Sequence, residues 1–159
     1  MHAGFIASHR IAMMVDKAVD LLLVEDCAED AELALAAVKS RKLAGNIVHL
    51  ADGDEAIQFI CASSISANWK AENAPRVIIL DLKLTRMGGL EVLQQLKAEE
   101  RTRPIPVVVL TGSAEEQEMK ECYHLGVNSY VVKPANATQY AQVVADIAHY
   151  WLNVNRAFH

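Results

Sequence analysis

Asp81 is the residue whose position in this sequence most needs a chemical explanation, because it directly follows the apolar run Val77–Leu80. Four apolar residues in succession are typical of a strand that is covered on both faces, so the carboxylate stands at the tip of a buried strand. An unpaired charge is costly at such a place. The pattern therefore indicates that Asp81 has charged partners and takes part in a reaction.

Polar residues also follow three other apolar runs. Glu25 and Asp26 follow LLLV, Thr111 ends VVVLT, and Lys133 follows SYVV. Three carboxylates at one place repel one another, whereas a hard divalent cation such as Mg²⁺ favours such a set of oxygen ligands. A lysine and a hydroxyl beside this cluster suit a phosphoryl group, since each can bond one of its oxygens. These residues predict phosphoryl transfer to Asp81 as the nucleophile, with Thr111 and Lys133 assisting.

A doubly wound sheet would bring these residues together. Strand-like runs alternate with helix-like runs along the chain, and they cover residues 19–25, 46–51, 76–81, 105–111 and 128–133. Several of these runs are apolar without alternation, which indicates a parallel sheet with helices on both faces. Such sheets carry their working residues beyond the carboxyl ends of the strands. We therefore predict an α/β fold with a doubly wound, five-stranded parallel sheet.

The composition narrows the class of protein. The chain has 159 residues, a net charge of −5 and 52% hydrophobic residues, which suits one globular domain and argues against nucleic acid as a partner. No apolar run approaches the length that spans a bilayer, so we expect no membrane association. Three widely spaced cysteines suit the reducing cytoplasm. We expect a flexible N-terminal extension over residues 1–17, the domain over 18–154, a tail over 155–159, and an insert or surface loop over 63–75.

Taken in order, LLLVED, VIILDL with MGG, VVVLTGS and SYVVKP resemble the receiver domain of two-component response regulators, which is a flavodoxin-like fold. The resemblance covers residues 20–152. It implies that Asp81 accepts a phosphoryl group from a histidine kinase. It also implies that Glu25, Asp26 and Asp81 bind Mg²⁺ together with the backbone carbonyl of Lys83.

The same resemblance implies a switch and an unusual peptide bond. Thr111 is expected to move towards the phosphoryl group, and Tyr130 to swing inward with it. The bond between Lys133 and Pro134 is usually cis in this family, a geometry that fixes the lysine.

A finer resemblance is to the stand-alone regulators that partner prokaryotic phytochromes. It implies a regulator that catalyses only its own phosphorylation and dephosphorylation, with a light-sensing histidine kinase as donor. A receiver of a chemotaxis or phosphorelay pathway is the alternative. An aspartate-nucleophile phosphatase is more distant, because it would need a second aspartate where Lys83 stands. A flavin-binding electron carrier would need a phosphate loop where this chain has EDCAED.

The last predicted helix extends beyond what a sheet cover needs. It runs to about Val154 and adds Tyr150, Trp151 and Leu152 at more than one angle around the helix. Clustered aromatic and apolar residues of this kind predict a homodimer interface. The alternative is that Trp151 folds back on the core and the end of the helix frays.

Overall fold

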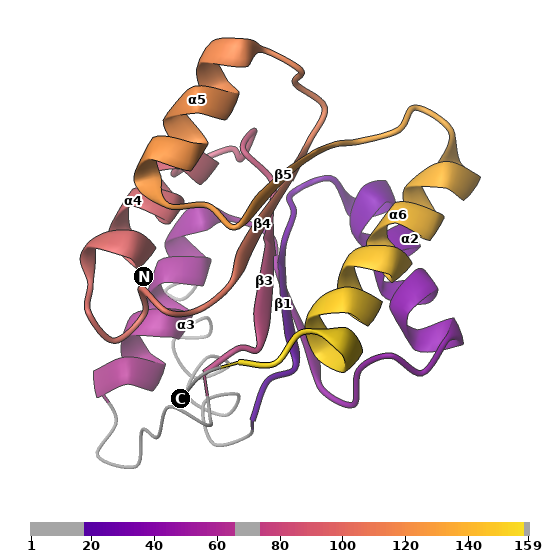
Figure 1. Ribbon diagram of the computed structural model, residues 1–159, viewed down its shortest axis with the longest axis horizontal. Coiled ribbons are helices and arrows are strands. Elements are labelled where there is room, and N and C mark those ends of the chain that lie inside the picture. Colours follow the sequence, from indigo (N-terminus) through magenta and orange to yellow (C-terminus); the bar gives the residue numbers. More distant parts are fainter. Residues whose placement is uncertain (1–17, 66–73, 158–159) are drawn as a thin grey trace, which may run out of the picture.

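A single five-stranded sheet forms the centre of the molecule, as the computed structural model in Figure 1 shows; it describes residues 18–65 and 74–157. The expected N-terminal extension, 1–17, lies outside the described residues. So do residues 66–73 of the expected insert.

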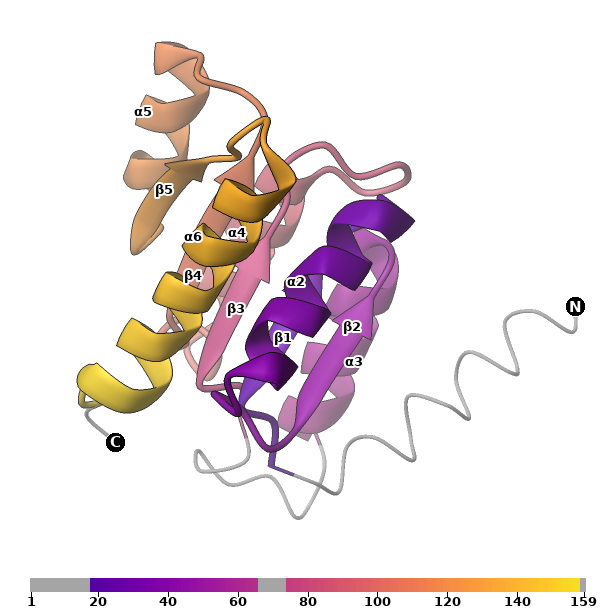
Figure 2. The ribbon, with the colours of Figure 1, turned by 90° about the vertical axis from the view of Figure 1, so that its right-hand side faces the viewer.

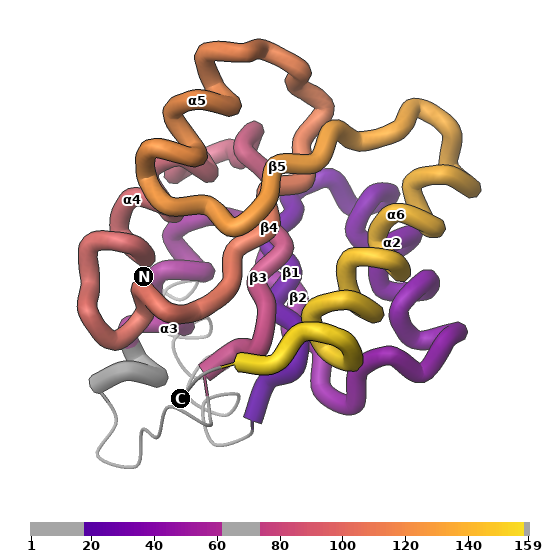
Figure 3. Tube along the Cα trace, viewed as in Figure 1, coloured from indigo at the N-terminus to yellow at the C-terminus, as the bar shows by residue number. Residues whose placement is uncertain are grey.

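All five strands are parallel, and their order across the sheet is β2-β1-β3-β4-β5. Figure 3 shows the central strands side by side. The strands are β1 (Leu21–Val24), β2 (Ile47–Leu50), β3 (Val77–Leu80), β4 (Val107–Thr111) and β5 (Ser129–Val132). This order confirms the predicted doubly wound fold. The chain winds one way from β1 to β2 and the other way from β3 to β4, so the order reverses between β1 and β3.

Helices cover both faces of the sheet. Figures 1 and 2 show α2 and α6 on one face and α3, α4 and α5 on the other. Their bounds are α2 (Ala28–Ser40), α3 (Gly53–Ile65), α4 (Gly89–Ala98), α5 (Glu116–Leu125) and α6 (Ala137–His149). The central strands β1, β3 and β4 are buried at every position. Because they bury both faces, they need no polar alternation, and this explains their continuous apolar sequence.

Side chains that alternate along the strands divide the core into two clusters. Leu22 and Ile78 pack with Phe59 of α3 and Leu93 of α4 on one face. On the other face, the remaining strand side chains pack with α2 and α6, and the members include Leu21, Leu23, Ile79, Val108, Ala34 and Val144. The sheet is therefore clamped between two apolar layers, which leaves only its ends free for polar chemistry.

The end of the last helix folds onto the protein itself. After α6 the chain makes a π-helical segment, η2 (Tyr150–Val154), and the Arg76 guanidinium donates to the carbonyl of Leu152 at 2.6 Å. The side chain of Leu152 is buried in the core cluster of α2 and α6, and Trp151 packs partly against that cluster. Leu152 therefore packs in the protein's own core, and the expected dimer interface at Tyr150, Trp151 and Leu152 stays a prediction. Tyr150 is about half exposed, at 49%.

Among the described residues, no helix combines the length and apolar character that crossing a bilayer requires.

Candidate functional site

The site is built at the carboxyl ends of β1 and β3, where the strand order reverses. Val24 and Leu80 are register partners, so the next residues, Glu25 and Asp81, leave the sheet side by side. The backbone pairing continues beyond the strands, since Asp81 donates its N–H to the carbonyl of Val24 at 3.0 Å and Glu25 donates to that of Leu50 at 3.1 Å. Both acids are thus held by main-chain bonds at the switch point, the usual place for a ligand in such sheets.

Glu25, Asp26 and Asp81 form the acidic cluster that the sequence predicts. One carboxylate oxygen from each lies within 4.8 Å of the others. Glu25 is only 2% exposed, and burial raises its pKa to about 7; the hydrogen bond from Lys133 opposes this rise and the charge of Asp81 adds to it. Carboxylates that are this close and this poorly hydrated fit a hard divalent cation, which would supply the missing positive charge.

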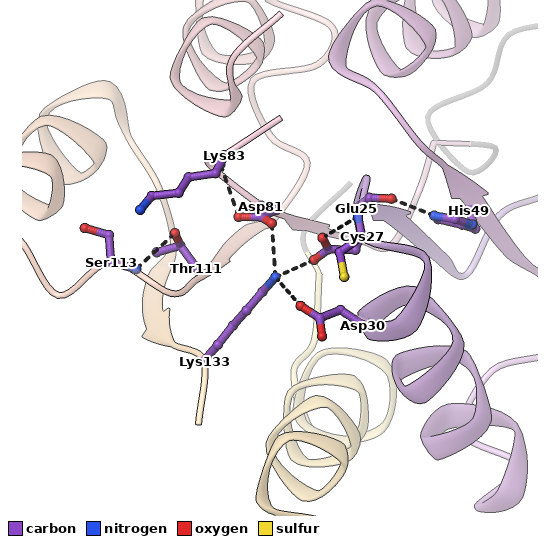
Figure 4. A network of polar contacts seen from close by, with 9 residues as sticks. All are labelled: Glu25, Cys27, Asp30, His49, Asp81, Lys83, Thr111, Ser113 and Lys133. Carbon is purple, nitrogen blue, oxygen red and sulfur yellow. Dashed lines mark hydrogen bonds and ion pairs between the residues drawn. The ribbon is translucent and has the colours of Figure 1, made fainter. Parts of the chain in front are cut away.

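Lys133 is the cation that the described residues themselves supply to the cluster. Its Nζ lies 2.7 Å from Glu25 Oε2, 3.0 Å from Asp81 Oδ2 and 3.0 Å from Asp30 Oδ2, as Figure 4 shows. Burial alone would lower the pKa of Lys133, but the hydrogen bonds to Glu25 and Asp30 and the charge of Asp81 raise it well above its ordinary value. The lysine is therefore charged and offsets part of the negative charge that surrounds it.

The expected cis bond before Pro134 is not found. Every peptide bond of the described residues is trans, including the one between Lys133 and Pro134. The trans form is the ordinary preference before proline, by about 0.5–1 kcal/mol. With this trans bond, Lys133 already reaches three carboxylates and donates its backbone N–H to the carbonyl of Thr111 at 2.7 Å.

The loop after Asp81 is folded tightly back onto that residue. The N–H of Lys83 donates to Asp81 Oδ1 at 3.2 Å, and the N–H of Gly89 donates to the carbonyl of Leu82 at 3.0 Å. A Cβ on Gly89 would stand 2.2 Å from the carbonyl oxygen of Asp81. Only glycine allows α4 to begin so close to Asp81. That the carbonyl of Lys83 is a metal ligand stays a prediction.

Thr111 and Tyr130 are connected through Ser113. The hydroxyl of Thr111 accepts from the N–H of Ser113 at 3.4 Å, and the Tyr130 hydroxyl donates to the carbonyl of Ser113 at 2.9 Å. Thr111 is fully buried at the end of β4. A shift of Thr111 would therefore be felt by the loop after β4 and by the Tyr130 ring.

Sequence reasoning missed three contributors to the site. Asp30, in the first turn of α2, forms the third ion pair of Lys133. His49 Nε2 lies 2.8 Å from the carbonyl of Glu25, and the N–H of Cys27 donates to Glu25 Oε1 at 3.1 Å. The sequence did carry a signal for Asp30: it is an acid in the first turn of a helix, and that helix begins soon after Glu25 and Asp26. No comparable signal pointed to His49, whose contact depends on the pairing of β1 with β2.

Comparison with known proteins agrees with this geometry. The family model described as response regulator receiver domain matches residues 21–145. The chain is 37% identical to the probable methanogenesis regulatory protein FilR2 of Methanothrix harundinacea over 86% of each chain. It is 35% identical to the response regulator Rcp1 of Synechocystis sp., over 83% of this chain and 88% of that protein.

Solved structures give the same result. The Mn²⁺-bound form of Rcp1 superposes with a TM-score of 0.77 at 31% identity, covering 89% of this chain and 99% of that one. The phosphorylated cyanobacterial phytochrome response regulator RcpA superposes with a TM-score of 0.80 at 33% identity, with the same coverage of both chains.

The acidic cluster predicts stabilisation by a divalent cation. Because the cation would bind only the folded cluster, millimolar Mg²⁺ should raise the melting temperature of the wild type by mass action. The rise should shrink strongly in Asp26→Asn. It should persist in Asp146→Asn, a matched change on α6 at a carboxylate that bonds Gln142 and lies outside the cluster. Thermal melts by circular dichroism, with and without Mg²⁺, measure this; an unchanged wild-type curve would contradict the prediction.

Proposed function

The chain belongs to the response regulator receiver domain family, and from that membership we propose that Asp81 accepts a phosphoryl group from a histidine kinase, with Mg²⁺ held by Glu25, Asp26, Asp81 and the carbonyl of Lys83. The observation that carries this proposal is the convergence of three carboxylates and Lys133 on one point at the strand ends. The receiver domain extends over residues 18–154 and is followed by a tail, 155–159.

Each residue has a distinct part in the transfer. A carboxylate oxygen of Asp81 attacks the phosphorus of a phosphohistidine; an O–P bond forms, the N–P bond breaks, and the released imidazole nitrogen takes a proton from solvent. Bound Mg²⁺ would supply positive charge for the equatorial phosphoryl oxygens. Lys133, which already reaches Asp81 Oδ2, bonds a phosphoryl oxygen by moving a short distance. Thr111, at the end of β4, offers its hydroxyl to another.

The phosphoryl donor is a phytochrome-type light-sensing kinase. Support comes from the similarity to RcpA, which is described as a phytochrome response regulator, and to the bacteriophytochrome response regulator RtBRR at 41% identity. A chemotaxis or phosphorelay receiver is the second candidate, since the chain also matches chemotaxis proteins named CheY over 60 residues. The proposal places the protein in the cytoplasm. Phosphotransfer profiling against the histidine kinases of the source organism separates the two candidates.

The phosphatase alternative has little support. Such an enzyme needs a general acid two residues after its nucleophile. Lys83 occupies this position, and its side chain extends on the Thr111 and Ser113 side of Asp81 in Figure 4.

The phosphorylation state is read through Thr111 and Tyr130. When Thr111 turns its hydroxyl to the phosphoryl group, it gives up its present bond from the N–H of Ser113. The loop at Ser113 is then free to shift, and the Tyr130 hydroxyl loses or follows its carbonyl partner. The docking surface at β5 and α5 changes as a result.

The acceptor assignment predicts a single labelled residue. With Mg²⁺ and a small phospho-donor, the wild type should gain one hydroxylamine-labile phosphoryl group, and Asp81→Asn should gain none. The substitution replaces the carboxylate of Asp81, which is the proposed nucleophile, by an amide. Intact-mass spectrometry measures the label, and equal labelling of Asp81→Asn would overturn the assignment. Asp52→Asn, which alters an acid at the start of α3, is the control that should label normally.

The position of Lys83 predicts that this residue controls how long the phosphoryl group stays on Asp81. Its long side chain is exposed and extends beside Asp81 on the side of Thr111 and Ser113, where it would cover a phosphoryl group on that carboxylate. We expect Lys83→Ala to speed autodephosphorylation several-fold, because it uncovers this side. Mg²⁺ affinity should hardly change, since only the backbone of residue 83 is expected to bind metal. Decay of the labelled protein is followed by phosphate release, and a lifetime equal to that of the wild type would show that Lys83 plays no part.

The protein also forms a homodimer, with η2 at the interface. Tyr150 and Val154 are 49% and 55% exposed, and the Tyr150 ring stands edge-on to Trp151 at 5.1 Å between centroids. Sedimentation velocity at micromolar concentration should show a dimer that Tyr150→Lys dissociates. Tyr123→Lys on α5, a matched change at an equally exposed tyrosine, should leave the dimer intact. A wild type that sediments as a monomer, with and without the phosphoryl group, would contradict this.

A further inference from the structure

We propose that Asp30 is a positioning residue for Lys133: it keeps the ammonium when Glu25 and Asp81 turn their oxygens to a divalent cation, and so makes cation binding stronger without being a ligand. The inference deepens the proposed function and rests on it. The carboxylate that carries it comes from α2, outside the three strand ends at which the other charged groups meet.

The ammonium of Lys133 is shared among three acids. An ammonium has three N–H donors, and Lys133 has one carboxylate within 3.0 Å for each of them. Two of these partners, Glu25 and Asp81, also belong to the acidic cluster, but Asp30 does not. The lysine and an incoming cation therefore compete for two of the three acids, while the third belongs to the lysine alone.

The surroundings of Lys133 make an anionic partner necessary. Its side chain is only 13% exposed, so water can replace a lost partner only in part. On the α6 side it meets the ring of Tyr140, whose centroid is 6.0 Å from Nζ. Tyr140 is itself buried, and within the described part of the chain its hydroxyl has no hydrogen-bond partner. When a poorly hydrated ammonium leaves Glu25 and Asp81, it needs another negatively charged partner nearby.

Asp30 is placed to be that charge. It lies in the first turn of α2, and Ala31 and Ala34 bury the inner side of this helix against the sheet. Its side chain is 34% exposed, whereas those of Glu25 and Asp81 are 2% and 7% exposed. Asp30 therefore keeps contact with water, and it can take a larger share of the ammonium at little cost in desolvation.

Removal of Asp30 should strengthen the ion pairs of Lys133 with Glu25 and Asp81, and these ion pairs compete with the cation. With only Glu25 and Asp81 left as partners, the ammonium holds both more firmly, and displacing it leaves a largely buried charge without an anion. Cation affinity then falls, although no ligand has been lost. If Asp30 acts through Lys133, this loss should vanish when the lysine is absent, which is a coupling that a double-mutant cycle measures.

The experiment is a Mn²⁺ titration of the full chain, followed by electron paramagnetic resonance of the free ion. Asp30→Asn should weaken Mn²⁺ binding several-fold relative to the wild type. Glu29→Gln, at the exposed neighbouring acid of the same helix turn, is the matched control for the loss of one negative charge and should have a smaller effect. Asp30→Glu should restore most of the affinity. In a Lys133→Met background, Asp30→Asn and Glu29→Gln should have equal effects.

Two outcomes would overturn the inference while leaving the proposed function intact. In one, Asp30→Asn weakens binding no more than Glu29→Gln does. In the other, Asp30→Asn weakens binding equally with and without Lys133, which would mean that Asp30 attracts the cation directly. A wild type that binds no Mn²⁺ would overturn the proposed function along with it. Melting of the metal-free variants verifies that each is folded before titration.

Discussion

The structure depends on one balance of charge, in which the largely buried ammonium of Lys133 meets the carboxylates of Glu25, Asp81 and Asp30. Burying acids at the tips of central strands is unfavourable by itself, as the raised pKa of Glu25 shows. Lys133 offsets only one of the negative charges, so the resting protein keeps a net negative pocket. That remaining charge is what makes the pocket a site for a divalent cation and, together with it, for a phosphoryl group.

The packing of the sheet keeps these charged groups in fixed positions. Its three central strands are buried on both faces, so their ends cannot shift without disturbing two apolar layers. Main-chain bonds run one residue past the strands and hold Glu25 and Asp81 in register. The loop after Asp81 closes back on it because Gly89 has no side chain. The acidic groups are thus pre-organised for a divalent cation, which would relieve their mutual repulsion.

Signalling by such a site requires one part that moves while the acids stay in place. The chain of bonds from Thr111 through Ser113 to Tyr130 has that character, because it lies in a loop and joins the end of β4 to β5. Lys133 is the other movable part, because its three carboxylate partners allow the ammonium to form ion pairs in more than one position.

The amino-acid sequence by itself determined the sheet and the residues at its strand ends. Parallel strands bring their carboxyl ends to one edge, so the identity of the residue after each apolar run was enough to assemble Glu25, Asp81, Thr111 and Lys133. Only the tertiary structure decided what reaches this edge from elsewhere. Asp30 arrives because α2 packs on the sheet, and His49 arrives through the pairing of β2 with β1. Leu152 is buried in the core cluster of α2 and α6, a contact that forms only when the end of the chain packs on that layer. Strand periodicity is a local property, whereas these contacts join segments far apart in the chain, and their geometry exists only once the layers have packed.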